Sequence, residues 1–133
     1  MNDFNELIIY LMAIEGKAKD IHYTCSGADF YGKHLFADRI ADGIDDFIDQ
    51  IKETCLLGHG EKPLFASEYY AMAGNMVDKN NTFQSMLDLI LDTLAHIETM
   101  KNISKGDSKL LDDIAGKLQN DKGLLHIMLG DYK

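Results

Sequence analysis

Two histidines and three acidic residues lie at spacings that suit a metal site. They are His22, His34, Asp38, Asp49 and Glu53. Imidazole nitrogens and carboxylate oxygens together suit Fe(II), and the oxygens also favour Fe(III), although zinc or manganese can occupy such a set. Bound iron would supply the redox chemistry, so these five residues are our candidates for both metal ligation and catalysis.

The spacing of the last four candidates indicates that one chain cannot complete this site. We read residues 34–53 as one helix, in which the rise per residue places Asp38 and Asp49 roughly 16 Å apart along the axis. At about 100° per residue, all four candidates fall within a sector of about 100° and form one stripe. A second copy lying antiparallel would bring the two ends of the stripes together. We therefore expect a metal site shared between two copies.

Apolar residues recur at helical intervals in the elements that would carry these ligands. The predicted long helices span residues 3–23, 30–58, 82–104 and 107–129. Asp3 and Glu6 have the order of a capping box in the first helix, and Asp107 or Ser108 is expected to cap the last.

A long crossover separates the second and third of these helices. It contains SEYYAMA (67–73), which predicts a short extra helix, and it implies that the two flanking helices run in the same direction. Four long helices with one crossover indicate an all-α, ferritin-like four-helix bundle. We expect one such domain over residues 1–133.

Charge and composition narrow the possible partners. The sequence has 13 Lys and Arg residues against 22 Asp and Glu residues, a formal charge of -9 that suits cation handling and disfavours nucleic acid and anionic membranes. No apolar run is long enough to span a bilayer and no signal-type leader is found, so we expect a cytoplasmic protein. In that compartment Cys25 and Cys55 would remain reduced.

The segment HYTCSGADFYGKHLFAD, followed eleven residues after Asp38 by DQIKE, resembles the signature of Dps-type miniferritins. In that family, as here, a His-aromatic pair precedes a second His by twelve residues, and Asp, Asp and Glu follow at intervals of four, eleven and four. The crossover phrase Lys62-Pro63-Leu64 and the segment GDSKLLDDIAGKL also resemble the family, so the resemblance covers nearly the whole chain.

The resemblance implies a function, an assembly and a division of the ligands. His22, His34 and Asp38 of one chain would bind iron with Asp49 and Glu53 of another, and Glu53 would bridge. Fe(II) would be oxidised by hydrogen peroxide or dioxygen and stored as ferric mineral inside a hollow dodecamer built from two-fold dimers. That activity is iron storage with ferroxidase catalysis, which protects against oxidative stress.

Three further expectations accompany this one. Asp107, Asp112 and Asp113 either line an iron-entry pore, as similar positions do in the family, or serve capping and solvent-facing roles. We expect no DNA binding, because no basic residue precedes Lys17 and the sequence shows no basic patch. The competing hypothesis is a non-enzymatic helical scaffold or interaction protein with at most a structural metal site.

Overall fold

The computed structural model describes residues 1–131, and most of them lie in helices. The helices are α1 (Asp3–Thr24), α2 (Phe30–Ala41), α3 (Ile44–Gln50), α4 (Ala66–Met76), α5 (Phe83–Thr99) and α6 (Lys105–Leu129). A π-helical segment, η1 (Ile51–Leu56), and a 3-10 turn, η2 (Leu57–His59), continue α3. Residues 1–131 contain no β-strand, so the predicted all-α class is confirmed.

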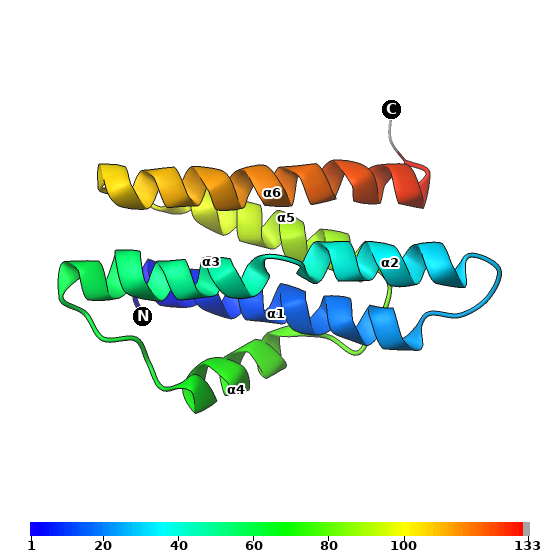
Figure 1. Ribbon diagram of the computed structural model, residues 1–133, viewed down its shortest axis with the longest axis horizontal. Helices are drawn as coiled ribbons and strands as arrows, with labels where there is room; N and C mark the ends of the chain where they lie inside the picture. The colour runs from blue at the N-terminus through cyan, green and yellow to red at the C-terminus, as the bar shows by residue number, and fades with distance from the viewer. Residues whose placement is uncertain (132–133) are drawn as a thin grey trace.

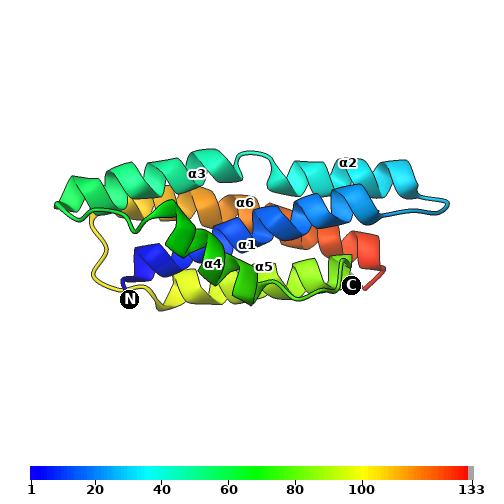
Figure 2. The ribbon, with the colours of Figure 1, turned by 90° about the horizontal axis from the view of Figure 1, so that it is seen from below.

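The long helices lie side by side along the long axis of the molecule (Figure 1). α1 runs in one direction, α2 and α3 return end to end, α5 runs in the same direction as α3, and α6 reverses again (Figures 1 and 2). The crossover carries α4 across one side, against α1. The predicted short helix in the crossover and the parallel course of its flanking helices are therefore confirmed.

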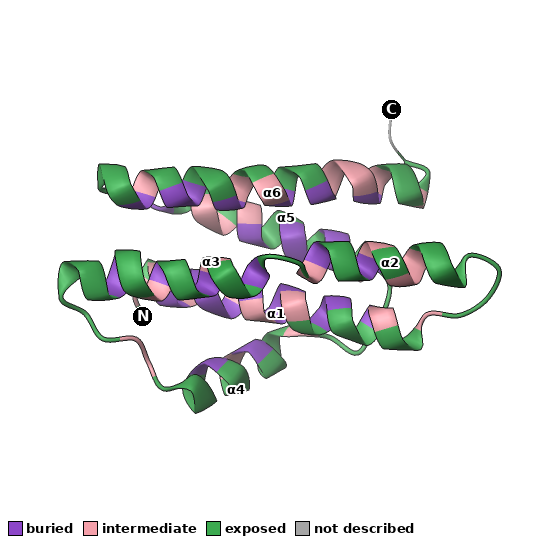
Figure 3. Ribbon diagram, viewed as in Figure 1, coloured by how far each residue is buried: buried purple, intermediate pink, exposed green. Residues whose placement is uncertain are grey.

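The apolar core lies around α1, which contacts α2, α3, α4 and α5. Its inward face buries Leu7, Leu11, Ile14 and Ile21 at intervals of three, four or seven residues. Figure 3 shows the exposed residues along the outer sides of α3 and α6 and the buried ones on the sides that face neighbouring helices. Each fully buried Leu or Ile contributes about 1.5–3 kcal/mol, so this face holds the fold together. None of the described helices is both long and apolar enough to cross a bilayer.

The helix caps differ from the sequence prediction at two of the long helices. Asn2, not Asp3, caps α1, because its side chain accepts a hydrogen bond from the Phe4 amide at 2.7 Å. Ser104 caps α6 by accepting from the Asp107 amide at 3.2 Å, so Lys105 and Gly106 lie inside the first turn. The predicted caps at Asp107 or Ser108 are wrong because those residues are already helical.

The prediction of one uninterrupted helix from residue 34 to residue 53 is also wrong. α2 ends where the Asp42 amide bonds the Asp38 carbonyl, and Gly43 has a φ of +81°, in the left-handed region that glycine adopts without strain. α3 then begins and widens into η1 after Gln50. Ile40 and Ile44 stay fully buried on either side of the break, so both pieces keep their apolar sides on the core.

Two polar contacts fasten the crossover to α1. The Lys17 ammonium is buried and lies 2.7 Å from an Asp78 carboxylate oxygen. The fully buried Tyr69 hydroxyl donates to the Asn5 side-chain oxygen at 2.5 Å and accepts from the Leu64 amide at 3.1 Å. Because buried polar groups without partners are costly, these contacts fix where α4 lies.

Candidate metal centre

His22 and His34 are held against each other by a reciprocal pair of hydrogen bonds. His22 lies in the last turn of α1 and His34 lies in the second turn of α2, so the short connection after Thr24 brings the two together. His22 Nδ1 is 2.8 Å from the His34 carbonyl oxygen, and His34 Nδ1 is 2.7 Å from the His22 carbonyl oxygen. The two rings stack with their centroids 3.5 Å apart and their planes at 18°.

These contacts assign the ring nitrogens. A carbonyl oxygen can only accept, so Nδ1 of each ring carries the hydrogen and Nε2 of the neutral ring carries the lone pair. Neither Nε2 has a hydrogen-bond partner within residues 1–131. A backbone carbonyl on the other ring nitrogen is the usual outer contact of a metal-binding histidine. The arrangement therefore suits two Nε2 ligands.

Large apolar side chains surround this pair and remain exposed. Tyr23, Phe30, Tyr31 and Leu35 are 79%, 42%, 68% and 49% exposed. The Tyr23 ring meets His22 edge-on at 4.8 Å, and the Phe30 ring lies 5.2 Å from that of His34. A group of exposed apolar residues is typical of an interaction surface. Three of these residues are aromatic, and together with Leu35 we call them the aromatic patch.

The structure does not bring all five predicted ligands together in one chain. Asp38 is exposed on α2, one turn after His34, but its carboxylate does not form a three-ligand cluster with the two histidines. Asp49 is exposed on α3 and Glu53 is exposed in η1, beyond the break at Gly43. π-helical segments are frequent at functional sites, and Glu53 lies within this one.

Glu15 and Asp45 form a carboxyl pair near Asp49 that sequence reasoning missed. Both line a pocket of about 340 Å³ together with Asp49, Lys52 and other residues. Burial, then a hydrogen bond with Asp45 and its negative charge, raise the pKa of Glu15 to about 7. α1 and α3 pack together here, so the proximity arises from the tertiary fold and no local spacing signals it.

Asp107, which the sequence suggested for an iron-entry pore or a solvent-facing role, is buried. It is 4% exposed and its carboxylate lies 2.8 Å from His59 Nε2, which joins η2 to the start of α6. Burial and the neighbouring Asp107 raise the pKa of the Cys55 thiol to about 12, so Cys55 remains a thiol. Asp112 and Asp113 are exposed on α6.

Comparison with protein-family models finds no match for this chain, and no curated protein matches it either. The resemblance to Dps-type miniferritins therefore rests on the residues quoted above.

Proposed function

We propose that two copies of the chain pair across the surface that carries these ligands, bind Fe(II) between them and oxidise it. In this proposal His22, His34 and Asp38 belong to one copy, and Asp49 and Glu53 of the other complete the site. The product would collect as ferric mineral inside a larger closed oligomer, as in the family that the sequence resembles. Iron is the substrate, with hydrogen peroxide or dioxygen as the oxidant.

The reciprocal hydrogen bonds of His22 and His34 are the observation that carries this proposal. Histidines that only stabilise a fold usually use their ring nitrogens to satisfy buried partners. Here both Nδ1 atoms bond to backbone carbonyls, which orients the rings and leaves both Nε2 atoms for a ligand outside the chain. The exposed aromatic patch beside them fits a second copy of the chain.

The acidic residues explain why the site needs the second copy. Two imidazoles alone bind Fe(II) weakly and carry no charge to balance Fe(III), whereas carboxylates favour the oxidised ion. Asp38, Asp49 and Glu53 are all exposed, and within the described residues their carboxylates form no hydrogen bond or ion pair. A pair of copies would place acidic residues of one beside the histidines of the other.

The residues would hold two Fe(II) ions within reach of one oxidant molecule. Each ion would lose one electron, and hydrogen peroxide would accept both electrons and two protons to give two water molecules. Hydrolysis of the ferric product would release more protons than this reduction consumes. Because the imidazoles must be neutral to bind, iron affinity is expected to fall on acidification.

Stopped-flow measurement of Fe(II) oxidation tests the proposal. We expect Asp49→Ala, Glu53→Ala and His22→Gln each to lower the initial rate by about 10–100-fold, because metal sites tolerate loss of a ligand poorly. Glu98→Ala is the matched control, since it removes an exposed carboxylate of α5 without touching the ligand stripe. Oxidation at the wild-type rate in both Asp49→Ala and Glu53→Ala would refute the site.

The aromatic patch also suits the competing function, a helical interaction protein with a structural metal. The two functions differ in turnover. An iron oxidase continues to consume oxidant after its sites are filled, whereas a structural site binds a fixed number of ions and stops. Oxidant consumption measured with just enough Fe(II) to fill the sites, and again with a large excess, would separate the two functions, since only catalysis scales with added iron.

A further inference from the structure

A second group of potential metal ligands lies at the opposite end of α1 from His22. Asp3 and Glu6 are in the first turn of α1, and His96 is in the last turn of α5. One ligand atom from each lies within 4.8 Å of the others, and within residues 1–131 this is the sole cluster of three such residues. The His96 side chain is 9% exposed, so its ring is fixed in the protein.

The contacts of His96 determine which nitrogen faces the acidic residues. Nε2 is 3.0 Å from the Asp3 backbone carbonyl, which can only accept, so Nε2 carries a hydrogen. Nδ1 lies 3.6 Å from Glu6 Oε2, which is too long for a hydrogen bond. A lone pair on Nδ1 and a carboxylate would repel each other. This space therefore favours a cation, either a proton on Nδ1 or a metal ion between the two atoms.

The separation of these atoms fits a metal ion. Zinc binds His nitrogen and carboxylate oxygen at about 2.0–2.2 Å, so two ligand atoms at a tetrahedral zinc ion lie about 3.4 Å apart. The observed Nδ1 to Oε2 distance is 3.6 Å. Asp3 is exposed, so its carboxylate is free to rotate toward the same ion. The Asp3 carbonyl on Nε2 supplies the outer contact that orients a metal-binding imidazole.

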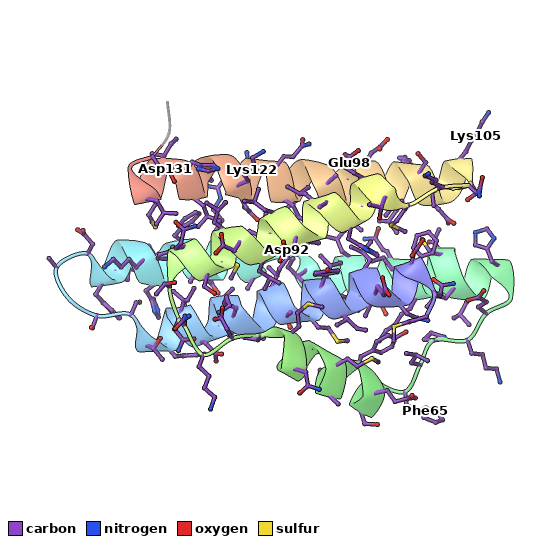
Figure 4. The ribbon with its side chains drawn as sticks, turned by 180° about the vertical axis from the view of Figure 1, so that it is seen from behind. Phe65, Asp92, Glu98, Lys105, Lys122 and Asp131 are labelled. Atoms are coloured by element: carbon purple, nitrogen blue, oxygen red, sulfur yellow. The ribbon has the colours of Figure 1, made fainter. Side chains whose placement is uncertain are left out.

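The surroundings of His96 are negative. The Tyr10 ring packs 5.3 Å from the His96 ring, and the pKa of the Tyr10 hydroxyl is raised by burial and then by the charges of Asp92 and Glu6. Asp92 lies one turn before His96 on α5, and Figure 4 labels it. The chain as a whole carries a formal charge of -9. These charges favour a divalent cation over a neutral ligand.

We propose that Asp3, Glu6 and His96 bind one divalent transition-metal ion of zinc-like chemistry, with water completing the coordination. One nitrogen and two carboxylate ligands suit such borderline ions. The ion would clamp the start of α1 to the end of α5. This proposal is independent of the iron site, because it uses none of the five ligands proposed there.

Calorimetric titration with zinc tests the proposal in a variant that lacks His22 and His34. In His22→Gln/His34→Gln protein, we expect one zinc ion per chain to bind. Adding His96→Gln should abolish this binding, and adding Glu6→Gln should weaken it at least 10-fold. The matched control is His126→Gln, which removes another histidine with a carboxylate partner near a helix end and should leave zinc binding unchanged.

The Tm of thermal unfolding gives a second measure of zinc binding, which does not depend on the number of ions bound per chain. At a zinc concentration 100 times its Kd, the Tm of the His22→Gln/His34→Gln chain should rise by on the order of 10 °C, because zinc would bind the folded state alone. The same addition should not move the Tm of the His96→Gln derivative.

Three results would overturn the proposal. In one, the His22→Gln/His34→Gln chain takes up no zinc. In another, side-chain nitrogen NMR finds both His96 nitrogens protonated and unaffected by zinc, which would make His96 the imidazolium partner of Glu6 only. In the third, zinc binding does not depend on Asp3 or Glu6, as expected if both residues serve only the helix dipole of α1.

Discussion

The Nδ1 atoms of His22 and His34 each meet the backbone carbonyl of the other histidine, and this detail could not be predicted from the sequence. The spacing of twelve residues and the neighbouring aromatic residues led us to predict that the two histidines are ligands. Their mutual hydrogen bonds depend on how the end of α1 meets α2, which follows from packing. The cluster of Asp3, Glu6 and His96 carried no sequence signal, because His96 lies about ninety residues from the other two.

Glu15 leads to a prediction about pH. Burial and Asp45 raise the pKa of Glu15 to about 7 from its ordinary value of 4.5, with Lys19 opposing weakly at 4.0 Å. The native state therefore holds this proton more tightly than the unfolded chain does. Its contribution to stability is fully present below about pH 4.5 and is lost as the pH rises through about 7.

We expect Glu15→Gln to remove this part of the pH dependence. Between pH 5 and pH 8 the wild-type free energy of unfolding should fall by about 1–2 kcal/mol more than that of the variant, after allowance for solvent screening. Urea denaturation at the two pH values measures the difference, with Glu98→Gln as a control on the exposed side of α5. Parallel pH profiles for wild type and Glu15→Gln would contradict the assignment.

At the scale of elements, most of the helices were predictable and the interruptions were not. The apolar period located α1, α5 and α6, and the crossover pattern located α4 within a few residues. The break between α2 and α3 was missed because Ile40 and Ile44 keep a helical spacing across it. The dipeptide Asp42-Gly43 is a turn signal, and it could have indicated the break.

Gly43 supplies a test of that break. Its φ of +81° disfavours any side chain, and an added Cβ would meet no atom within 4 Å, so Gly43→Ala should cost about 1–2 kcal/mol through backbone strain alone. Gly116→Ala is the control: it lies inside α6 with open space around it and should stabilise by about 0.5–1 kcal/mol. Chemical denaturation measures both. If Gly43→Ala stabilises the protein as Gly116→Ala does, the helix runs unbroken through residue 43.

At the scale of the whole molecule, most of the candidate ligands lie on a surface that is exposed in the single chain. The aromatic patch lies beside the histidine pair, and Asp49 and Glu53 are exposed farther along the same α2–α3 line (Figure 1). Asp38, Asp49 and Glu53 are exposed and His34 is half-buried, but the break at Gly43 interrupts the single helix from which one stripe was predicted. How two chains would meet across the stripe depends on the angle at the break, which no residue spacing encodes.

We expect purified protein to form dimers or the dodecamer that the resemblance implies. Light scattering should therefore give a mass near twice 14.9 kDa for a dimer, or near twelve times 14.9 kDa for a closed dodecamer. Tyr23→Glu/Leu35→Glu would place charges in the aromatic patch and should reduce the mass to 14.9 kDa. Tyr70→Glu changes another exposed aromatic residue, on α4, and should leave the assembly intact. A wild-type chain of 14.9 kDa in the presence of Fe(II) would contradict the shared site.

Gly43 also has a thermodynamic consequence. His34 and Asp38 precede Gly43, and Asp49 and Glu53 follow it, so the relative position of the two ligand pairs depends on the angle between α2 and α3. A neighbouring chain that contacts both helices would fix that angle, and an ion bound by ligands from both helices would do the same. Dimer affinity and iron affinity should then rise together by equal factors, as reciprocal linkage requires.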